Sequence, residues 1–308
     1  MAKEWEADRV LDPEALQTFL AGRFPELGPI HCVRLNEGWD SEAYEVNGRY
    51  IFKVPKRLEI SWKVQAEASL LKTLSGRITL PIPTPLFMAQ ATEIFPYPTF
   101  GYAKLLGEAG DGNLTQTQFV ALAPALGRFL SQLHGTPTEL LQTGKLPGAE
   151  ESDEFTELQK DRVQILTAAP PDLRPAFEDF IEGRKPAPPK MPKKLRLIHA
   201  DLYPEHLLFS EDRRLITGVL DWGDAGLGDP AYDLGFLLYL GPYEGWRQII
   251  ENYDFRDDPG LEARAVYWSL CRALSYLGML QATGERATPA GKKTAAYIRR
   301  WLSWLNRG

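Results

Sequence analysis

Residues 195–233 read LRLIHADLYPEHLLFSEDRRLITGVLDWGDAGLGDPAYD and contain three short apolar runs separated by polar residues. The runs LRLI, HLLF and RLITGVL are typical of small buried strands joined by tight turns. Asp201 follows the first run, His206 opens the second, and Asp221 follows the third. Because short strands hold their connecting loops in place, we expect these three side chains to be neighbours.

The spacing of these residues indicates phosphoryl transfer. Transfer from a nucleotide requires a carboxylate that orients the attacking hydroxyl and accepts its proton, and ligands that hold Mg²⁺ against the phosphates. The stretch has a His-x-Asp sequence, a potential ligand five positions after the aspartate, and then Asp221-Trp222-Gly223. Protein kinases use this order for the catalytic loop and the metal-binding turn.

Lys53 and Glu67 lie upstream, in segments with different predicted structures. Lys53 is in YIFKVPK, a strand-like run in which Phe52 and Val54 point to the opposite face. Glu67 is in SWKVQAEASLLKTL, whose apolar residues recur at helical spacing. In kinases, a lysine on a strand and a glutamate on the following helix form the ion pair that positions the phosphates. We therefore predict that Lys53 pairs with Glu67.

The segment around Lys53 predicts the first strands of an antiparallel sheet. Residues 30–56 contain three runs of alternating apolar residues, and Asn47-Gly48 predicts a tight hairpin turn between the last two. The loop NEGWDS between the first two has a single glycine, so it does not match a G-x-G-x-x-G nucleotide loop. It fits either an ordinary β-turn or a phosphate-covering loop.

Most of the remaining chain is predicted to be helical. Asp12 caps a first helix, and Thr115 with Gln118 begins a helix that runs to about His134. The proline-rich run 80–90 suits an edge strand or an extended link, and the basic run 184–194 an exposed connector. Further helices are expected at residues 153–168, 172–183, 234–240, 245–253, 259–283 and 289–306.

Three motifs resemble those of the aminoglycoside phosphotransferase family, which includes other antibiotic and small-molecule kinases. They read HADLYPEHLLF, LDWGDA and GDPAYDL, and the resemblance extends from about residue 35 to 240. It implies an α+β, two-lobed protein-kinase-like fold. Residues 1–104 would form a nucleotide-binding lobe with an antiparallel sheet and one main helix. Residues 105–308 would form a larger, mostly helical lobe for catalysis and acceptor binding.

The resemblance also assigns roles to the residues of the second lobe. Asp201 would be the catalytic base and Asp221 a metal ligand, with Asp229 and Asp233 as supporting acids. His206 stands where most kinase-like enzymes have an asparagine that binds Mg²⁺ through a hard oxygen. The 2''-type aminoglycoside phosphotransferases and the macrolide phosphotransferases resemble this chain in having histidine there. We treat His206 as a metal ligand and leave open whether a second metal binds.

In the first lobe, the resemblance implies a site for ATP or GTP. The loop near Ser41 would cover the phosphates, and Lys53 with Glu67 would hold them. The backbone of residues 102–106 would hydrogen-bond the base, which makes Tyr102 and Lys104 candidates for this site. The sequence does not distinguish ATP from GTP.

The acceptor is expected to be a small molecule with a hydroxyl group, and the 2''-type resemblance implies a cationic aminoglycoside. A macrolide is the close alternative, and a metabolic alcohol or amino sugar the third. The candidate acceptor-site residues are Asp224, Glu205, Asp233, Glu262, Tyr267, Trp268 and Arg272. An alternative of a different class is a catalytically silent nucleotide-binding module, although none of the motif residues is lost.

Composition agrees with an ordinary soluble enzyme. The 308 residues are 44% hydrophobic and 25% charged, and the net charge of −6 argues against a general nucleic-acid binder. Most of the acidic excess lies after residue 104. Cys32 and Cys271 lack metal-site spacing, and we see no signal peptide or membrane span. We therefore expect a cytoplasmic monomer that binds neither nucleic acid nor membranes.

Overall fold

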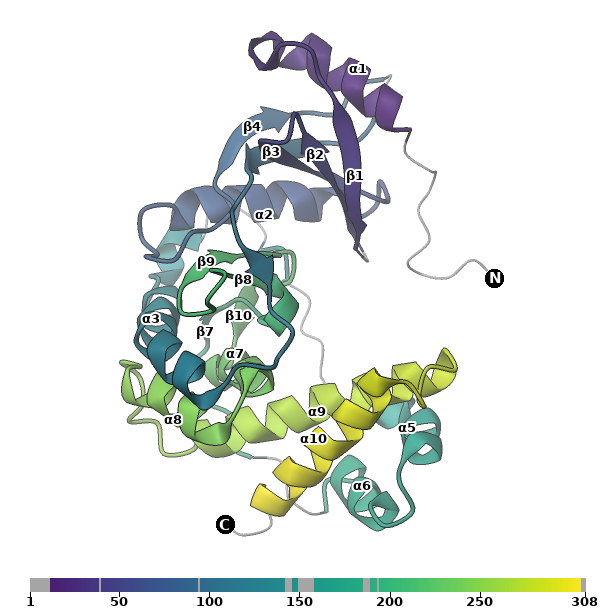
Figure 1. Ribbon diagram of the computed structural model, residues 1–308, viewed down its shortest axis with the longest axis vertical. Helices are drawn as coiled ribbons and strands as arrows, with labels where there is room; N and C mark the ends of the chain where they lie inside the picture. The colour runs from purple at the N-terminus through teal and green to yellow at the C-terminus, as the bar shows by residue number, and fades with distance from the viewer. Residues whose placement is uncertain are drawn as a thin grey trace.

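The computed structural model describes residues 12–38, 40–93, 95–141, 146–148, 158–184, 189–192 and 194–305. A lobe built on one sheet lies at the top of Figure 1, and a larger helical lobe lies below it. The predicted two-lobed α+β architecture is confirmed. Trp39, the start of the predicted helix 153–168 and part of the connector 184–194 lie outside the described residues.

Within the described residues, the upper lobe contains one antiparallel sheet with the strand order β1-β2-β3-β5-β4. Asn47 and Gly48, with φ of 55° and 66°, form the predicted turn between β2 and β3. The proline-rich run 80–90 leads into an edge strand, as predicted. The strands are β1 (Cys32–Glu37), β2 (Ser41–Val46), β3 (Tyr50–Pro55), β4 (Pro85–Ala89) and β5 (Thr99–Ala103).

Different helices cover the two faces of this sheet. Leu16 and Leu20 of α1 (Pro13–Arg23) share a core with Phe52 and Val54 of β3. α2 (Ser61–Leu74) lies between the sheet and the helical lobe (Figure 1). Because successive side chains along a strand alternate in direction, Lys53 points away from α1 and towards α2.

The helical lobe is organised around α9, which packs against α5, α7 and α10 (Figure 1). A second contact joins α3 to α8, and one continuous apolar core extends from α2 through both groups. The α-helices are α3 (Gln116–His134), α5 (Arg162–Ala168), α6 (Arg174–Ile181), α7 (Pro230–Leu237), α8 (Tyr243–Glu251), α9 (Leu261–Ala282) and α10 (Pro289–Leu305). Short 3₁₀ turns are η1 (Pro25–Leu27), η2 (Thr138–Leu141), η3 (Pro204–His206) and η4 (Leu238–Leu240). No helix in the described ranges is both long and apolar enough to cross a membrane.

The three apolar runs of residues 195–233 form strands, as predicted, but they do not form one sheet. β7 (Arg196–Ile198) pairs with β10 (Gly226–Gly228). β8 (Leu207–Phe209) pairs instead with β9 (Ile216–Val219) and with β6 (Glu108–Ala109). These two small sheets fix the loops that carry Asp201 and Asp221.

A buried ion pair joins α7 to α9 below these loops. Asp229 caps α7 by accepting a hydrogen bond from the Ala231 amide, and it also accepts one from Arg264 Nε at 2.8 Å. Arg264 is 2% exposed and Asp229 4%. Arg264 also pairs with Asp258 at 2.5 Å. Both buried charges are thus compensated, which their removal from water requires.

We predict that Arg264→Leu lowers the free energy of unfolding by about 3–5 kcal/mol, because it leaves the Asp229 carboxylate buried without its cation. Urea denaturation followed by circular dichroism measures this loss. Arg299→Leu is the matched control, since Arg299 and its partner Asp172 are both exposed. The control should leave the midpoint essentially unchanged, and an equal loss in both variants would contradict the prediction.

Candidate active site

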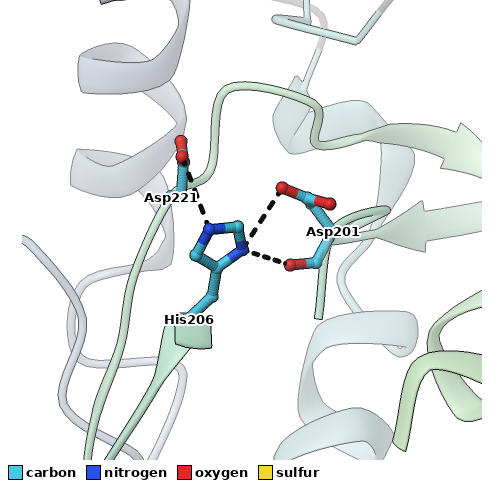
Figure 2. A group of neighbouring side chains, drawn as sticks. All are labelled: Asp201, His206 and Asp221. Atoms are coloured by element: carbon cyan, nitrogen blue, oxygen red, sulfur yellow. Dashed lines mark hydrogen bonds and ion pairs between the residues drawn. The ribbon is translucent and has the colours of Figure 1, made fainter. Parts of the chain in front are cut away.

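Asp201, His206 and Asp221 of the lower lobe lie next to one another (Figure 2). His206 Nδ1 lies 2.7 Å from the Asp201 carbonyl oxygen and 3.2 Å from its Oδ2. His206 Nε2 lies 3.8 Å from Asp221 Oδ2. Burial disfavours a charged imidazole, but the two carboxylates outweigh burial and raise the pKa of His206 to about 9. The structure therefore places these three residues together, as the sequence predicted.

Lys53 links the two lobes at this point. Its ammonium lies 2.8 Å from Glu67 Oε2 on α2 and 2.9 Å from Asp221 Oδ1 in the lower lobe. Burial disfavours the charge on Lys53, but Asp221 and Glu67 outweigh it and raise its pKa. Lys53 in turn is the main cause of the lowered pKa of Asp221. The predicted pair of Lys53 with Glu67 is present and includes Asp221 as a third member.

The loop that carries Asp201 is held from beneath by Asp233. The fully buried Asp233 carboxylate accepts hydrogen bonds from the amides of His199 and Ala200, both at 2.8 Å. Ala200 has φ of 66°, in the left-handed region that costs a non-glycine residue energy. The two hydrogen bonds compensate for this conformation and fix the backbone immediately before Asp201.

His199 shapes the same loop and stays neutral. Its Nε2 lies 3.0 Å from the Leu220 carbonyl oxygen, and its Nδ1 accepts a hydrogen bond from the Asp201 amide. Burial lowers the pKa of His199. Its ring lies 4.5 Å from that of Trp222, and the Trp222 amide donates to Glu67 Oε1. These contacts hold the loop that carries Asp201 in place.

His134, the last residue of α3, has a buried side chain that joins two distant segments. His134 Nε2 lies 3.0 Å from Asp233 Oδ2, and its Nδ1 lies 2.7 Å from the Tyr253 hydroxyl. The 99-residue separation of His134 and Asp233 explains why no local pattern revealed this contact.

The polar loop between β1 and β2 is held by ion pairs that sequence reasoning missed. Asp40 accepts hydrogen bonds from Arg57 at 2.8 Å and from Lys63 at 3.0 Å. The Gly38 amide donates to the Ser41 carbonyl oxygen, which closes the turn. Ser41 therefore lies at the base of a charge-braced loop. The side chains of Arg57 and Lys63 thus hold this loop in position through Asp40.

Tyr102 and Lys104 differ in their relation to the site. Lys53, Glu67 and Asp221 all influence the pKa of Tyr102, which burial above all raises. Lys104 donates its amide to the Arg49 carbonyl oxygen and pairs its ammonium with Glu45. The structure does not bring the Lys104 side chain to the site, because its charge is already paired on the sheet.

Three of the acceptor-site candidates face other parts of the protein. Asp233 is wrongly predicted as an acceptor contact, because its carboxylate is fully buried under the catalytic loop. Tyr267 is also wrong, since it is 2% exposed and its ring packs 4.9 Å from that of Phe180. Glu262 accepts a hydrogen bond from the Tyr243 hydroxyl within the helical lobe.

The other four candidates lie at or near the surface of the lower lobe. Asp224 and Glu205 are exposed. Loss of water around the carboxylate, together with the negative charges of Asp201 and Asp221, raises the pKa of Asp224 to about 6. Trp268 and Arg272 are half-buried, and Trp268 Nε1 donates to Asp229 at 2.9 Å. These four residues remain candidates for acceptor contacts.

Three neighbouring side chains offer donor atoms that could hold a divalent cation such as Mg²⁺. Ligand atoms of Asp201, His206 and Asp221 lie within 4.8 Å of one another. Asp221 is 45% exposed at its side chain and offers the carboxylate oxygens that Mg²⁺ prefers. A His206 ring that is protonated at neutral pH cannot donate a lone pair to a metal. Asp221 therefore fits as the ligand, whereas His206 would first have to lose its proton.

We predict that His206 titrates near pH 9 in metal-free protein. Because the pKa of His206 is raised from about 6.5 to about 9, the ion pairing of charged His206 with the two carboxylates stabilises the fold fully below about pH 6.5. This stabilisation is lost as the pH rises through 9. NMR of the imidazole carbons measures the titration, and His206→Gln identifies the signal. Urea denaturation should show about 3 kcal/mol of stability lost between these pH values, absent in His206→Gln. A ring that titrates near pH 6.5 would contradict this assignment.

Comparison with known proteins places this geometry in a family. A model of the phosphotransferase enzyme family matches residues 31–267. The uncharacterized protein YcbJ of Bacillus subtilis (strain 168) is 27% identical over 224 residues, 67% of each chain. Acyl-CoA dehydrogenase family member 10 of Mus musculus is 22% identical over 250 residues, 74% of this chain. The match covers only 22% of the mouse protein.

Solved structures show the same fold. The GDP complex of aminoglycoside 2'-phosphotransferase-IIIa matches with a TM-score of 0.74 and 23% identity, over 95% of this chain and 99% of that one. Macrolide 2'-phosphotransferase MphH from Brachybacterium faecium matches with a TM-score of 0.61 and 24% identity, over 92% and 98%. The predicted kinase-like fold and the prediction of a nucleoside-triphosphate-dependent phosphotransferase are confirmed. Since the family model matches well over half of its residues, the chain belongs to the phosphotransferase enzyme family.

Proposed function

We propose that this protein transfers the γ-phosphoryl group of ATP or GTP to a hydroxyl group of a small molecule. The contact of Lys53 with both Glu67 and Asp221 carries the proposal, since it joins a phosphate-binding cation to a metal-ligand carboxylate. Asp201 lies on the other side of the His206 ring from Asp221, which supports the proposal that Asp201 is the base. Positioning and charge neutralisation supply most of the catalysis in reactions of this class.

Each residue has a definite part in the proposed reaction. Lys53, held by Glu67, binds the α- and β-phosphates, and Asp221 would hold Mg²⁺. Mg²⁺, when bound, neutralises charge on the β- and γ-phosphate oxygens. Asp201 orients the acceptor hydroxyl and accepts its proton as the new oxygen–phosphorus bond forms. The bond between the γ-phosphorus and its bridging oxygen breaks, and the nucleoside diphosphate leaves.

The nucleotide is expected to lie between the sheet and the lower lobe. We propose that the braced loop with Ser41 at its base covers the phosphates and that the backbone near Tyr102 binds the base. Neighbouring structures support a nucleotide as co-substrate, because they include GDP and ADP complexes. The choice between ATP and GTP follows from the walls of the base pocket and is open.

Two acceptor classes follow from the relatives. An aminoglycoside is the first, because structures of similar proteins are complexes with kanamycin and gentamicin. The exposed Asp224 and Glu205 are the groups that would receive its ammonium groups. A macrolide is the second, because macrolide 2'-phosphotransferases share the fold. Either activity would give antibiotic resistance, and a metabolic alcohol remains the third possibility.

The setting of the enzyme follows from its composition. The described cysteines, Cys32 and Cys271, are free thiols, as expected of a reduced compartment. We propose a cytoplasmic monomer that acts on small molecules and not on nucleic acid or membranes. A catalytically silent nucleotide-binding module is the competing proposal. Absence of turnover by the native protein would favour it.

We predict that Asp201→Ala lowers phosphoryl transfer by about 10³-fold or more, because it removes the group that orients the hydroxyl and accepts its proton. Binding of a fluorescent ATP or GTP analogue should stay nearly unchanged, since Asp201 is placed at the acceptor side. Release of nucleoside diphosphate over a panel of acceptors measures transfer. Retained turnover in this variant would remove the mechanism.

We predict that Lys53→Met raises the KM for nucleotide and lowers kcat by about 100-fold together, because the phosphates lose their cation and Glu67 loses its partner. Steady-state kinetics with ATP and GTP measure both constants. Lys72→Met provides the control, since Lys72 is an exposed lysine at the far end of α2. Equal kinetics for the two variants would argue against the assignment of Lys53.

A further inference from the structure

A cavity of about 240 Å³ lies at the end of α3 in the lower lobe. Its lining comes from two segments, residues 134–139, which end α3 and follow it, and residues 194–196, which lead into β7. One ordered water needs about 10–15 Å³, so the cavity has room for a small molecule. The basic run 184–194 ends in the lining of this cavity, at Lys194.

This cavity is distinct from the candidate active site. Arg196, the first residue of β7, lines it, whereas Asp201 follows the last residue of that strand. Lys53, His206 and Asp221 are not among the lining residues either. A molecule bound here would therefore leave the nucleotide and acceptor positions open.

Arg196 presents its guanidinium to the cavity in a fixed position. The guanidinium carbon lies 3.6 Å from the centre of the Phe255 ring, within the range of a cation–π contact. Nη1 of Arg196 donates to the His134 carbonyl oxygen at 3.1 Å. A guanidinium has further N–H donors, and it can give two of them to one anionic group. The Arg196 side chain is thus ordered before any ligand binds.

The carbonyl groups that end α3 already have donors from the protein. A helix C-terminus carries a partial negative charge on carbonyls that lack partners, and this charge disfavours an anion nearby. The Gly135 amide donates to the Ser131 carbonyl oxygen at 2.9 Å, and the Thr136 amide to that of Leu133 at 3.0 Å. The carbonyl of the last helical residue accepts from Arg196. These hydrogen bonds reduce the repulsion that an anion would meet.

Lys194 adds a second positive charge to the lining, and Glu139 adds a carboxylate. Both side chains are exposed, and within the described residues neither takes part in an ion pair. A phosphate monoester carries about two negative charges at pH 7 and three acceptor oxygens. Two cationic side chains with available donors match this group in both charge and hydrogen bonding.

We propose that this cavity binds a small hydroxyl-bearing molecule with a phosphate monoester group. Arg196 would hold the phosphate through paired N–H donors, and Lys194 would hold it as a point charge. The rest of the molecule would lie in the cavity, where Glu139 accepts a hydrogen bond from one of its hydroxyl groups. The site does not depend on the proposed phosphoryl transfer.

The test uses the full-length protein with Mg²⁺ and a saturating non-hydrolysable nucleotide analogue, so that the phosphate positions of the active site are filled. The probes are glycerol 3-phosphate, glycerol and 1,3-diaminopropane, and equilibrium dialysis gives their dissociation constants. We expect glycerol 3-phosphate to bind with a Kd below about 1 mM, at least about tenfold more tightly than the other two. No binding of glycerol 3-phosphate, or equal binding of the diamine or of glycerol, overturns the proposal.

Charge reversal in the lining locates the bound probe. Lys194→Glu should weaken binding of glycerol 3-phosphate at least about tenfold, because it replaces an attracting charge with a repelling one. Lys190→Glu is the matched control, since Lys190 is an exposed residue of the same basic run and does not line the cavity. The control should leave the Kd unaltered. Unchanged binding in Lys194→Glu, or equal weakening in both variants, overturns the proposal.

Two further measurements separate this site from the active site. Glycerol 3-phosphate should not displace a fluorescent nucleotide analogue, and Asp201→Ala should bind glycerol 3-phosphate as tightly as the native protein does. Displacement of the analogue, or weaker binding in Asp201→Ala, would assign the probe to the active site and overturn the proposal. Absence of phosphoryl transfer in the native protein would instead contradict the proposed function and leave this site standing.

Discussion

The ammonium of Lys53 is the contact on which the arrangement of the two lobes depends. It lies within 3 Å of Glu67 on α2 and of Asp221 in the lower lobe. A buried lysine without these partners would be strongly disfavoured, and so would the 3%-exposed Glu67 without Lys53. The pairing therefore does not simply add stability. It favours the arrangement of the sheet, α2 and the turn that carries Asp221 in which all three charges are compensated.

The catalytic loop depends on a second contact of the same kind, made by hydrogen bonds. Asp233 holds the amides of His199 and Ala200, and His134 holds Asp233 from the opposite side. Ala200 keeps a positive φ because these bonds over-determine its backbone. Since these hydrogen bonds already hold the loop, Asp201 would not need to be ordered during the proposed reaction.

The sequence predicted the parts of this protein that follow local rules. Strand alternation put Lys53 on the face opposite to Phe52, and helical spacing put Glu67 on the next helix, so their pairing could be anticipated. The contacts of His134 and the braces on Asp40 join segments that no periodicity connects, and they could not be. The lobe boundary after residue 104 and the monomeric state stay predictions.

The acids of the motifs illustrate why a residue's type does not determine its task. Asp201 and Asp221 contact opposite sides of the His206 ring, and their side chains are 16% and 45% exposed. Asp229 and Asp233 have the same chemistry, but distant donors surround them: Arg264 for the first, and His134 with two amides for the second. A carboxylate that is fully hydrogen-bonded inside the protein has no capacity left for a ligand. Asp229 and Asp233 therefore hold α7, α9 and the loop before Asp201 in place instead of facing a ligand.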